Sequence, residues 1–195
     1  MPFEMATLAD VKTALVMLCV SMCLASATNA MAQEPRLKNI TLSGTDDRMV
    51  LSMRVEGAFT PDLIESIRKE AQAEFTFLIR LYRDRGMWLD EKLASFDLTH
   101  SLHYDQSRQV YVIYRSWATA PLVETRSFAE AQALMSTIGR IDILPLAQMQ
   151  RGEGYELRAK AELSRITLPY YLHYVFYFVT LWDFETDWHS VYFIY

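Results

Sequence analysis

Residues 155–163 read YELRAKAEL, and apolar and charged side chains alternate at every position. The apolar set is Tyr155, Leu157, Ala159, Ala161 and Leu163, and the charged set is Glu156, Arg158, Lys160 and Glu162. Successive side chains of an extended strand point to opposite faces of its sheet. This period of two therefore predicts a strand with one buried face and one solvated face.

Three further segments, 49–55, 75–81 and 94–104, repeat the same alternation. A fourth, Gln109 to Arg115 (QVYVIYR), is apolar on both faces, which is typical of a central strand. The residues Asp105-Gln106-Ser107 separate the last two segments and favour a hairpin turn between them. The strands follow one another closely, so an antiparallel sheet architecture is expected.

Two helices are expected between the strands. Thr60 followed by Pro61 is a helix start, and an apolar stripe of Leu63, Ile64, Ile67 and Ala71 follows it. Ser127 and Glu130 have the spacing of a capping box, in which each side chain satisfies a backbone donor at the helix start. The stripe of this second helix is Phe128, Ala131, Met135 and Ile138, and Gly139 is the expected stop. The fold class predicted is mainly β, an antiparallel β-sandwich with one or two short α-helices.

The N-terminal segment has the pattern of a secretory signal. Residues 14–27 read ALVMLCVSMCLASA, Lys12 precedes this uncharged run, and Ala30-Met31-Ala32 is an A-x-A cleavage pattern. We therefore expect residues 1–32 to be a signal peptide and residues 33–195 to be a single β-sandwich domain. The expected location is the periplasm or the outer face of the inner membrane. The alternatives are an uncleaved anchor, which would be the one expected membrane contact, and a buried helix.

Composition narrows the classes of function. Both cysteines, Cys19 and Cys23, lie inside the apolar run, so cleavage would leave no disulfide and no thiolate nucleophile. The net charge of −5 at pH 7 gives no basic surface for nucleic acid, and no nucleic-acid partner is expected.

The most unusual stretch is LPYYLHYVFYFVTLW, residues 168–182. It is shorter than the roughly 20 residues that a membrane-spanning helix needs, and it is rich in residues that favour strands. We predict a strand through about Phe184 and a terminal strand over Trp188–Tyr195. The aromatic stretch is interpreted as core, as a surface for a partner or membrane, or as a membrane span, in that order. As a surface it would use Tyr170, Tyr171, Tyr174, Trp182 and Trp188.

Residues with catalytic or metal-binding chemistry are few. His100 and His103 lie three apart on a predicted strand and so point to opposite faces, which makes His100 a core residue. A cation site would need His173 and His189 with three carboxylates, Asp183, Glu185 and Asp187. A hydrolase would use His100 or His103 with Asp97 or Asp105. Because no nucleophile or phosphate-loop motif occurs, no catalytic, cofactor-binding or metal-binding residue is assigned.

Several segments in order resemble a known family. They are IRLYRDRGMWLDEKL (79–93), SLHYDQSRQVYVIYR (101–115), GYEL (154–157), Leu168-Pro169, and the tryptophans Trp182 and Trp188. In this order they resemble the exported bacterial proteins grouped as domain of unknown function 4390, over Arg36 to Trp188. The resemblance implies a signal-bearing, mainly β domain with a sensory or envelope role. It implies no catalytic residue, because no activity is established for the family.

Three hypotheses about function follow. The first is a non-enzymatic envelope domain, a protein-interaction or sensory accessory module, that binds an envelope protein or lipid. The second is a domain that holds an apolar ligand or lipid between its sheets, for which the high aromatic content leaves room. The third is a hydrolase.

Overall fold

The computed structural model describes residues 34–86, 89–167 and 184–195. The chain divides between Ala32 and Gln33 into two units, and all described residues belong to the second. The predicted signal segment and nearly all of the aromatic stretch therefore lie outside the described residues. The strands are β1 (Arg36–Gly44), β2 (Arg48–Glu56), β3 (Gln72–Arg83), β4 (Glu91–Asp105), β5 (Val110–Arg115), β6 (Leu122–Thr125), β7 (Thr137–Pro145), β8 (Gly154–Thr167) and β9 (His189–Ile194). The helices are α2 (Pro61–Arg68), α3 (Phe128–Ser136) and the short 3-10 turn η1 (Leu146–Gln148).

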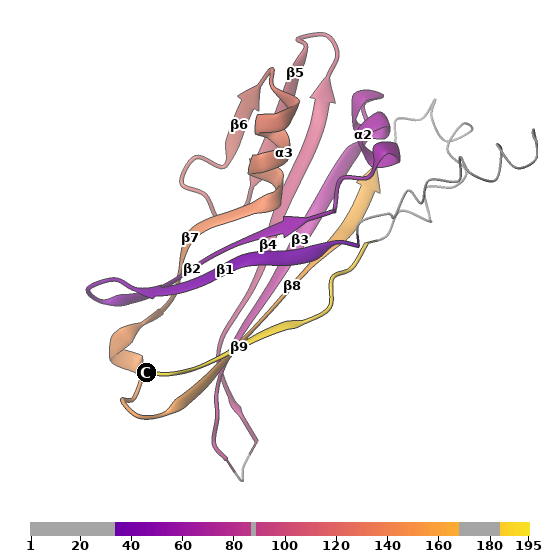
Figure 1. Cartoon of the computed structure of the whole chain (residues 1–195). Coiled ribbons are helices and arrows are strands. Elements are labelled where there is room, and N and C mark those ends of the chain that lie inside the picture. Colours follow the sequence, from indigo (N-terminus) through magenta and orange to yellow (C-terminus); the bar gives the residue numbers. More distant parts are fainter. Residues whose placement is uncertain (1–33, 87–88, 168–183) are drawn as a thin grey trace, which may run out of the picture. The chain divides into compact units, whose positions relative to one another are not determined.

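These strands form two antiparallel sheets. The small sheet has three strands in the order β1-β2-β7, and the large sheet has six in the order β6-β5-β4-β3-β8-β9. Every pairing is antiparallel. Figure 1 shows the strands of the small sheet crossing those of the large sheet, with α3 beside β5 and β6. The mainly β fold class with two antiparallel sheets is confirmed.

The core lies between the facing sides of the two sheets. On β3 the apolar residues of the alternating pattern, Phe75, Phe77, Ile79 and Leu81, are all fully buried. The same parity holds on β8, where Tyr155, Leu157 and Ala159 are buried, and on β2, where Leu51, Met53 and Val55 are. Each large apolar side chain buried in this way stabilises the fold by about 1.5–3 kcal/mol. We call the side of each sheet that faces this core its inner face.

Helix α2 begins as the sequence predicts. The Thr60 hydroxyl oxygen accepts a hydrogen bond from the Leu63 backbone N–H at 3.3 Å, and Pro61 is the first helical residue. The helix ends at Arg68, so Ala71 is buried but lies beyond the helix and not on its stripe. Helix α2 contacts β3 and β4 and covers one end of the large sheet.

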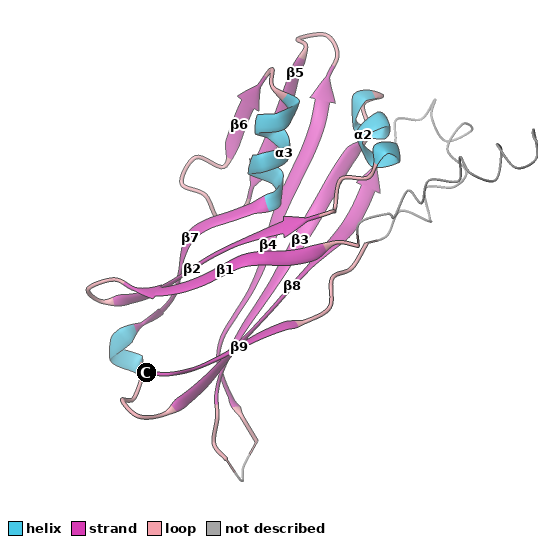
Figure 2. Cartoon of the chain, viewed as in Figure 1, coloured by secondary structure: helices cyan, strands magenta, loops and turns pink. Residues whose placement is uncertain are grey.

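Helix α3 ends earlier than predicted. The helix stops at Ser136, and Thr137 is already extended, with φ −119° and ψ 123°. Ile138 and Gly139, expected at the end of the helix, belong to β7, which pairs with β2. Figure 2 shows helix and strand following each other directly. Gly139 is therefore not a helix stop, and pairing with β2 overrides the helical periodicity.

Strands β1, β6 and β7 were not predicted. Most side chains of β1 are exposed, and its pairing with β2 shifts register between Lys38 and Thr41, where Asn39 has a φ of 54°. Such a bulge interrupts the period of two that the sequence argument needs. Strand β6 has four residues, too few for a pattern to stand out.

Candidate functional site

Large hydrophobic side chains are exposed mainly at the C-terminal end of the described residues. Seven are exposed in these ranges, and four of them are Trp188 (47% exposed), Tyr192 (73%), Ile194 (77%) and Tyr195 (37%). We call these four residues the C-terminal surface. The other three, Leu89, Tyr114 and Leu122, lie before β4, on β5 and on β6. The four residues of the C-terminal surface lie within eight positions of one another. Exposed apolar patches mark interaction sites more often than scattered apolar residues do.

Strand β9 holds this surface in place by pairing with β8. The register runs without a shift from Gly154 opposite Ile194 to Ala159 opposite His189. The inner side chains Val191 and Phe193 pack against the core, and the ring of Phe193 stacks on that of Tyr155 with centroids 5.6 Å apart. Tyr192 and Ile194 point to the other face, so their exposure follows from the same alternation.

A buried carboxylate anchors the outer side of β9. Glu156 is only 5% exposed and accepts a hydrogen bond from Arg158 Nη2 at 2.6 Å. Ser190 and Tyr192, whose hydroxyls also act on its pKa, lie on the neighbouring strand β9. The bond from Arg158 is the main cause that lowers the pKa of Glu156 to about 2, and the two hydroxyls add to it. The bond to Glu156 raises the pKa of Tyr192. Tyr192 therefore exposes its ring on the same face of the sheet as Glu156.

The segment before β9 is fixed to β8 as well. The Thr186 N–H donates to the Ala161 carbonyl at 2.9 Å, and the Ala161 N–H donates to the Thr186 hydroxyl at 3.0 Å. Lys160, 9% exposed, pairs with Glu185, and its Nζ lies 5.8 Å from the centre of the Trp188 ring. This cation–π contact orients an aromatic ring that is otherwise open to solvent.

Beside Trp188 lies a groove of about 590 Å³. Its two walls are residues 34–38, which lead into β1, and residues 185–189, which lead into β9. Charges of both signs line it, Arg36 and Lys38 on the first wall and Asp187 on the second. The groove therefore extends the C-terminal surface beyond Trp188 with charged side chains of both signs.

The structure describes one of the five predicted surface residues. Trp188 is exposed and lines the groove, whereas Tyr170, Tyr171, Tyr174 and Trp182 lie outside the described residues. The use of all five remains a prediction. Tyr192, Ile194 and Tyr195 were not predicted from the sequence as surface residues. A signal for them exists, because the stretch HSVYFIY (189–195) carries apolar side chains on both faces of a strand, and one of these faces can be exposed.

His100 is a core residue, as predicted. It is fully buried, its Nδ1 lies 2.8 Å from the Met135 carbonyl oxygen, and its Nε2 accepts a hydrogen bond from Trp117 Nε1 at 2.7 Å. Because Nε2 accepts, Nδ1 carries the proton and donates to Met135. Burial, with a smaller contribution from Arg115, lowers the pKa of His100 to about 4, so the ring is neutral at pH 7.

The carboxylates of the hydrolase hypothesis have structural partners. Asp97 pairs with Arg80 at 2.7 Å. Asp105 holds the hairpin turn, where it accepts from the Ser107 hydroxyl at 2.6 Å and from the Arg108 N–H at 3.0 Å. Both ring nitrogens of His100 are also engaged. Asp97, Asp105 and His100 thus each have a structural partner, and the hydrolase hypothesis, which also includes His103, remains a prediction.

The cation site falls partly outside the described residues, because His173 and Asp183 do. In the ranges that the structure does describe, no group of three or more histidine, cysteine or carboxylate side chains is placed to hold a metal ion.

The chain was compared with known proteins. Residues 32–192, more than half of the chain, match the family described as Domain of unknown function (DUF4390). The chain belongs to this family. No curated protein and no solved structure matches it. The DUF4390 match begins next to Gln33, the first residue of the predicted domain.

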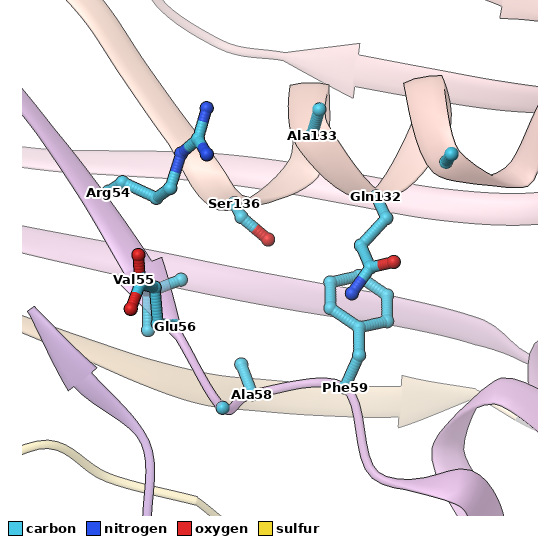
Figure 3. A pocket seen from close by; sticks show the side chains of 10 residues that line it. Arg54, Val55, Glu56, Ala58, Phe59, Gln132, Ala133 and Ser136 are labelled. Carbon is cyan, nitrogen blue, oxygen red and sulfur yellow. The ribbon is translucent and has the colours of Figure 1, made fainter. Parts of the chain in front are cut away.

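In this DUF4390 domain a second pocket, of about 460 Å³, lies between the end of β2 and α3. Figure 3 shows the side chains of Gln132 and Ser136 reaching toward this space, with Phe59 beside Gln132. Arg54 and Glu56, of opposite charge, also line it, and both are exposed. The lining offers no buried charge and no chemistry that selects one class of ligand.

The described part of the DUF4390 domain also bears on membrane contact. None of its helices has the length and apolar character needed to cross a bilayer.

Proposed function

We propose that this DUF4390 domain is a non-enzymatic interaction or sensory accessory module of the bacterial envelope, which binds an envelope protein through its C-terminal surface. The observation that carries the proposal is the concentration of exposed large hydrophobic side chains on Trp188, Tyr192, Ile194 and Tyr195. Tryptophan and tyrosine are the residues that most often dominate the binding energy of protein interfaces. The groove beside Trp188 gives such a partner a second point of contact.

The arrangement around Glu156 supports this use of Tyr192. A tyrosine buried by a partner must keep its hydroxyl hydrogen-bonded, or the complex loses about 1–3 kcal/mol. Here Tyr192 lies opposite Glu156 in the strand register, so a carboxylate acceptor lies on the same face of the sheet. A partner can therefore cover the ring without supplying an acceptor of its own.

Export is part of the proposal. Its support is the apolar run with its A-x-A pattern and a family match that begins at residue 32. The N-terminus of the protein recovered from its native cells tests it, and we expect Gln33. A chain that keeps Met1 and stays in the membrane fraction would indicate the uncleaved anchor instead.

Site-specific photo-crosslinking in cells tests the binding surface. A photoreactive amino acid replaces Trp188, and in a matched control it replaces Leu122, an exposed residue on the opposite edge of the large sheet. We expect a discrete crosslinked protein at position 188 and none at position 122. Equal patterns at both positions, or no adduct at either, would overturn the proposal.

A second candidate function is the binding of an apolar ligand at the side of the sandwich. A pocket of about 350 Å³ lies between β4 and β7, and its walls include Phe96, Leu98, Trp117 and Ile141. Its size is within the range of small-ligand sites. Native mass spectrometry of the purified protein should then show a bound mass that is lost on denaturation, and a bare chain would argue against this candidate.

A further inference from the structure

An exposed edge strand presents unpaired backbone N–H and C=O groups, onto which another strand can add. Proteins commonly protect such edges with charged side chains, proline, bulges or very short strands. The four edge strands of the described sheets are β1 and β7 in the small sheet, and β6 and β9 in the large one. They differ in how they are protected.

Three of these edges carry protection. Strand β1 has Arg36 and Lys38 and a register shift after Lys38. Strand β7 has Arg140 and Asp142, two register shifts against β2, and a proline at its end. Strand β6 is four residues long, follows Pro121, and contains Glu124, which pairs with Arg108.

Strand β9 carries none of these protections. Its sequence, HSVYFI, has no lysine, arginine, aspartate, glutamate or proline, and its register against β8 has no shift. Among the described residues it is a regularly paired, uncharged edge that bears the exposed side chains of Tyr192 and Ile194. An edge of this kind adds a further strand readily, either specifically or by aggregation.

Backbone geometry shows which groups β9 offers. The Tyr195 N–H donates to the Glu153 carbonyl on the β8 side. Backbone groups alternate in direction along an antiparallel strand, so we expect those of Ser190, Tyr192 and Ile194 to point to the free edge. Pairing with β8, from Gly154 opposite Ile194 to Ala159 opposite His189, holds these residues in a strand conformation before any partner arrives.

We propose that the partner at this edge is a second copy of the chain, whose β9 adds antiparallel to the first about a two-fold axis near Tyr192. This inference rests on the proposed function, because it uses the same C-terminal surface for protein binding. In a two-fold pairing each side chain lies near residues of an identical strand, so any charge would lie near a like charge. The absence of charge from β9 removes that repulsion.

The pairing also places compatible side chains across from each other. On the outer face Tyr192 meets Tyr192 of the second copy, and Ser190 meets Ile194. On the inner face Val191 meets Phe193, an aromatic and β-branched pair that stabilises antiparallel strands. Six residues per copy make a small interface, so the dimer forms weakly and its population depends on protein concentration.

Sedimentation velocity of the purified chain over a wide range of concentrations tests the pairing. We expect the wild type to shift from monomer to dimer as concentration rises. Tyr192→Lys places two like charges together across the axis and should leave a monomer, while Leu122→Lys on β6 should dimerise as the wild type does. If Tyr192→Lys does not fold by circular dichroism, Ile194→Pro takes its place, because proline removes a backbone N–H that points to the free edge and takes none from the pairing with β8.

The outcomes separate the two proposals. A wild type that is monomeric at every concentration, or a folded Tyr192→Lys variant that dimerises as well as the wild type, overturns self-pairing. If the crosslinks at position 188 then join only other proteins, the proposed function stands without this inference. If position 188 gives no crosslink and the chain is monomeric, both are wrong.

Discussion

His100 shows how a polar side chain is accommodated in an apolar core. Its two ring nitrogens have complementary partners, a carbonyl acceptor on α3 and an indole donor, and its ring lies between Phe77 and Trp117. An unpartnered polar group at this depth would cost about 1–3 kcal/mol. The His100 side chain on β4 is therefore linked to a backbone carbonyl of α3, and the hydrogen bond satisfies both polar groups.

The buried histidine predicts how stability depends on pH. The unfolded chain binds a proton near pH 6.5, whereas folded His100 does so only near pH 4. Between these values the unfolded state holds more protons, so the free energy of unfolding should fall as pH decreases from 6.5 to 4, by on the order of 2–3 kcal/mol. Urea unfolding across this window measures the slope.

Two variants isolate the contribution of His100. His100→Gln removes the titrating group and should flatten the slope. His103→Gln removes a half-buried histidine on the outer face of the same strand and should keep the slope. A wild-type slope in His100→Gln would assign the pH dependence to other groups.

Gly139 is needed for packing against Trp117. A Cβ at this position would come within 3.1 Å of Trp117 Cη2, closer than ordinary contact, and Gly139 is not among the residues with positive φ. Gly139→Ala should therefore displace the indole, weaken its bond to His100 and cost about 1–3 kcal/mol in thermal or chemical unfolding. Gly44→Ala is the control, since its nearest side-chain atom lies at 3.7 Å, and an equal loss in both variants would contradict this account.

At the scale of elements, β8 buries apolar side chains on its inner face and charged side chains on its outer face. Its inner residues are buried in the core, as the alternation predicts. Glu156 and Lys160, on the outer face, are nearly as buried. Burial of a charge requires a partner. Glu156 has Arg158 on its own strand, whereas Lys160 pairs with Glu162 on β8 and with Glu185 from the segment before β9.

Helix α3 is capped with the help of a residue before the predicted box. The Ser127 hydroxyl accepts from the Glu130 N–H at 3.3 Å, which is half of the capping box. The other half runs through Thr125, whose hydroxyl accepts from the Ser127 N–H at 3.1 Å and donates at short range to Glu130. In a complete capping box the Glu130 side chain would accept directly from the Ser127 N–H. Here the Thr125 hydroxyl lies between the two groups and bonds to both.

Removing the cap should destabilise the domain measurably. Ser127→Ala leaves the Glu130 N–H without its side-chain acceptor, and we expect a loss of about 1 kcal/mol in the free energy of unfolding. Thr125→Val should cost a similar amount because it breaks the relay. Ser43→Ala, at an exposed position of β1, is the control, and melting temperatures that are the same for all three would mean that α3 needs no cap.

At the scale of the whole domain, the two sheets share one hydrophobic core. Leu51 of the small sheet and Phe77 of the large sheet are both fully buried in the same cluster. Neither sheet could bury its inner face alone, so we expect the sheets to unfold together.

A large-to-small substitution tests this cooperativity. Leu51→Ala should cost about 2–5 kcal/mol and lower the transition seen by tryptophan fluorescence and by far-ultraviolet circular dichroism equally. Leu122→Ala, at a position that is 57% exposed, should change stability by no more than about 0.5 kcal/mol. Two separate transitions in Leu51→Ala would show that the sheets unfold independently.

The alternation in β2, β3, β4 and β8 was sufficient to predict the sandwich and the side on which His100 lies. The capping residues predicted the helix starts at Thr60 and Ser127. The prediction failed where long-range pairing competes with a local pattern. The sequence of residues 131–138 has helical spacing. In the structure, Thr137 and Ile138 pair with Arg54 and Met53 of β2, so the chain is already a strand at these positions. Of the four residues of the C-terminal surface, only Trp188 was predicted from the sequence.

The sequence by itself determined which side of each long strand is apolar, because that property depends only on side-chain order and the period of a strand. It also determined the helix starts, which depend on residues within one turn. Only the tertiary structure decided which strand forms each edge, that Glu156 and Lys160 are buried, and that β9 leaves Tyr192 and Ile194 exposed. These properties depend on which distant segments lie side by side, and no local periodicity encodes that choice.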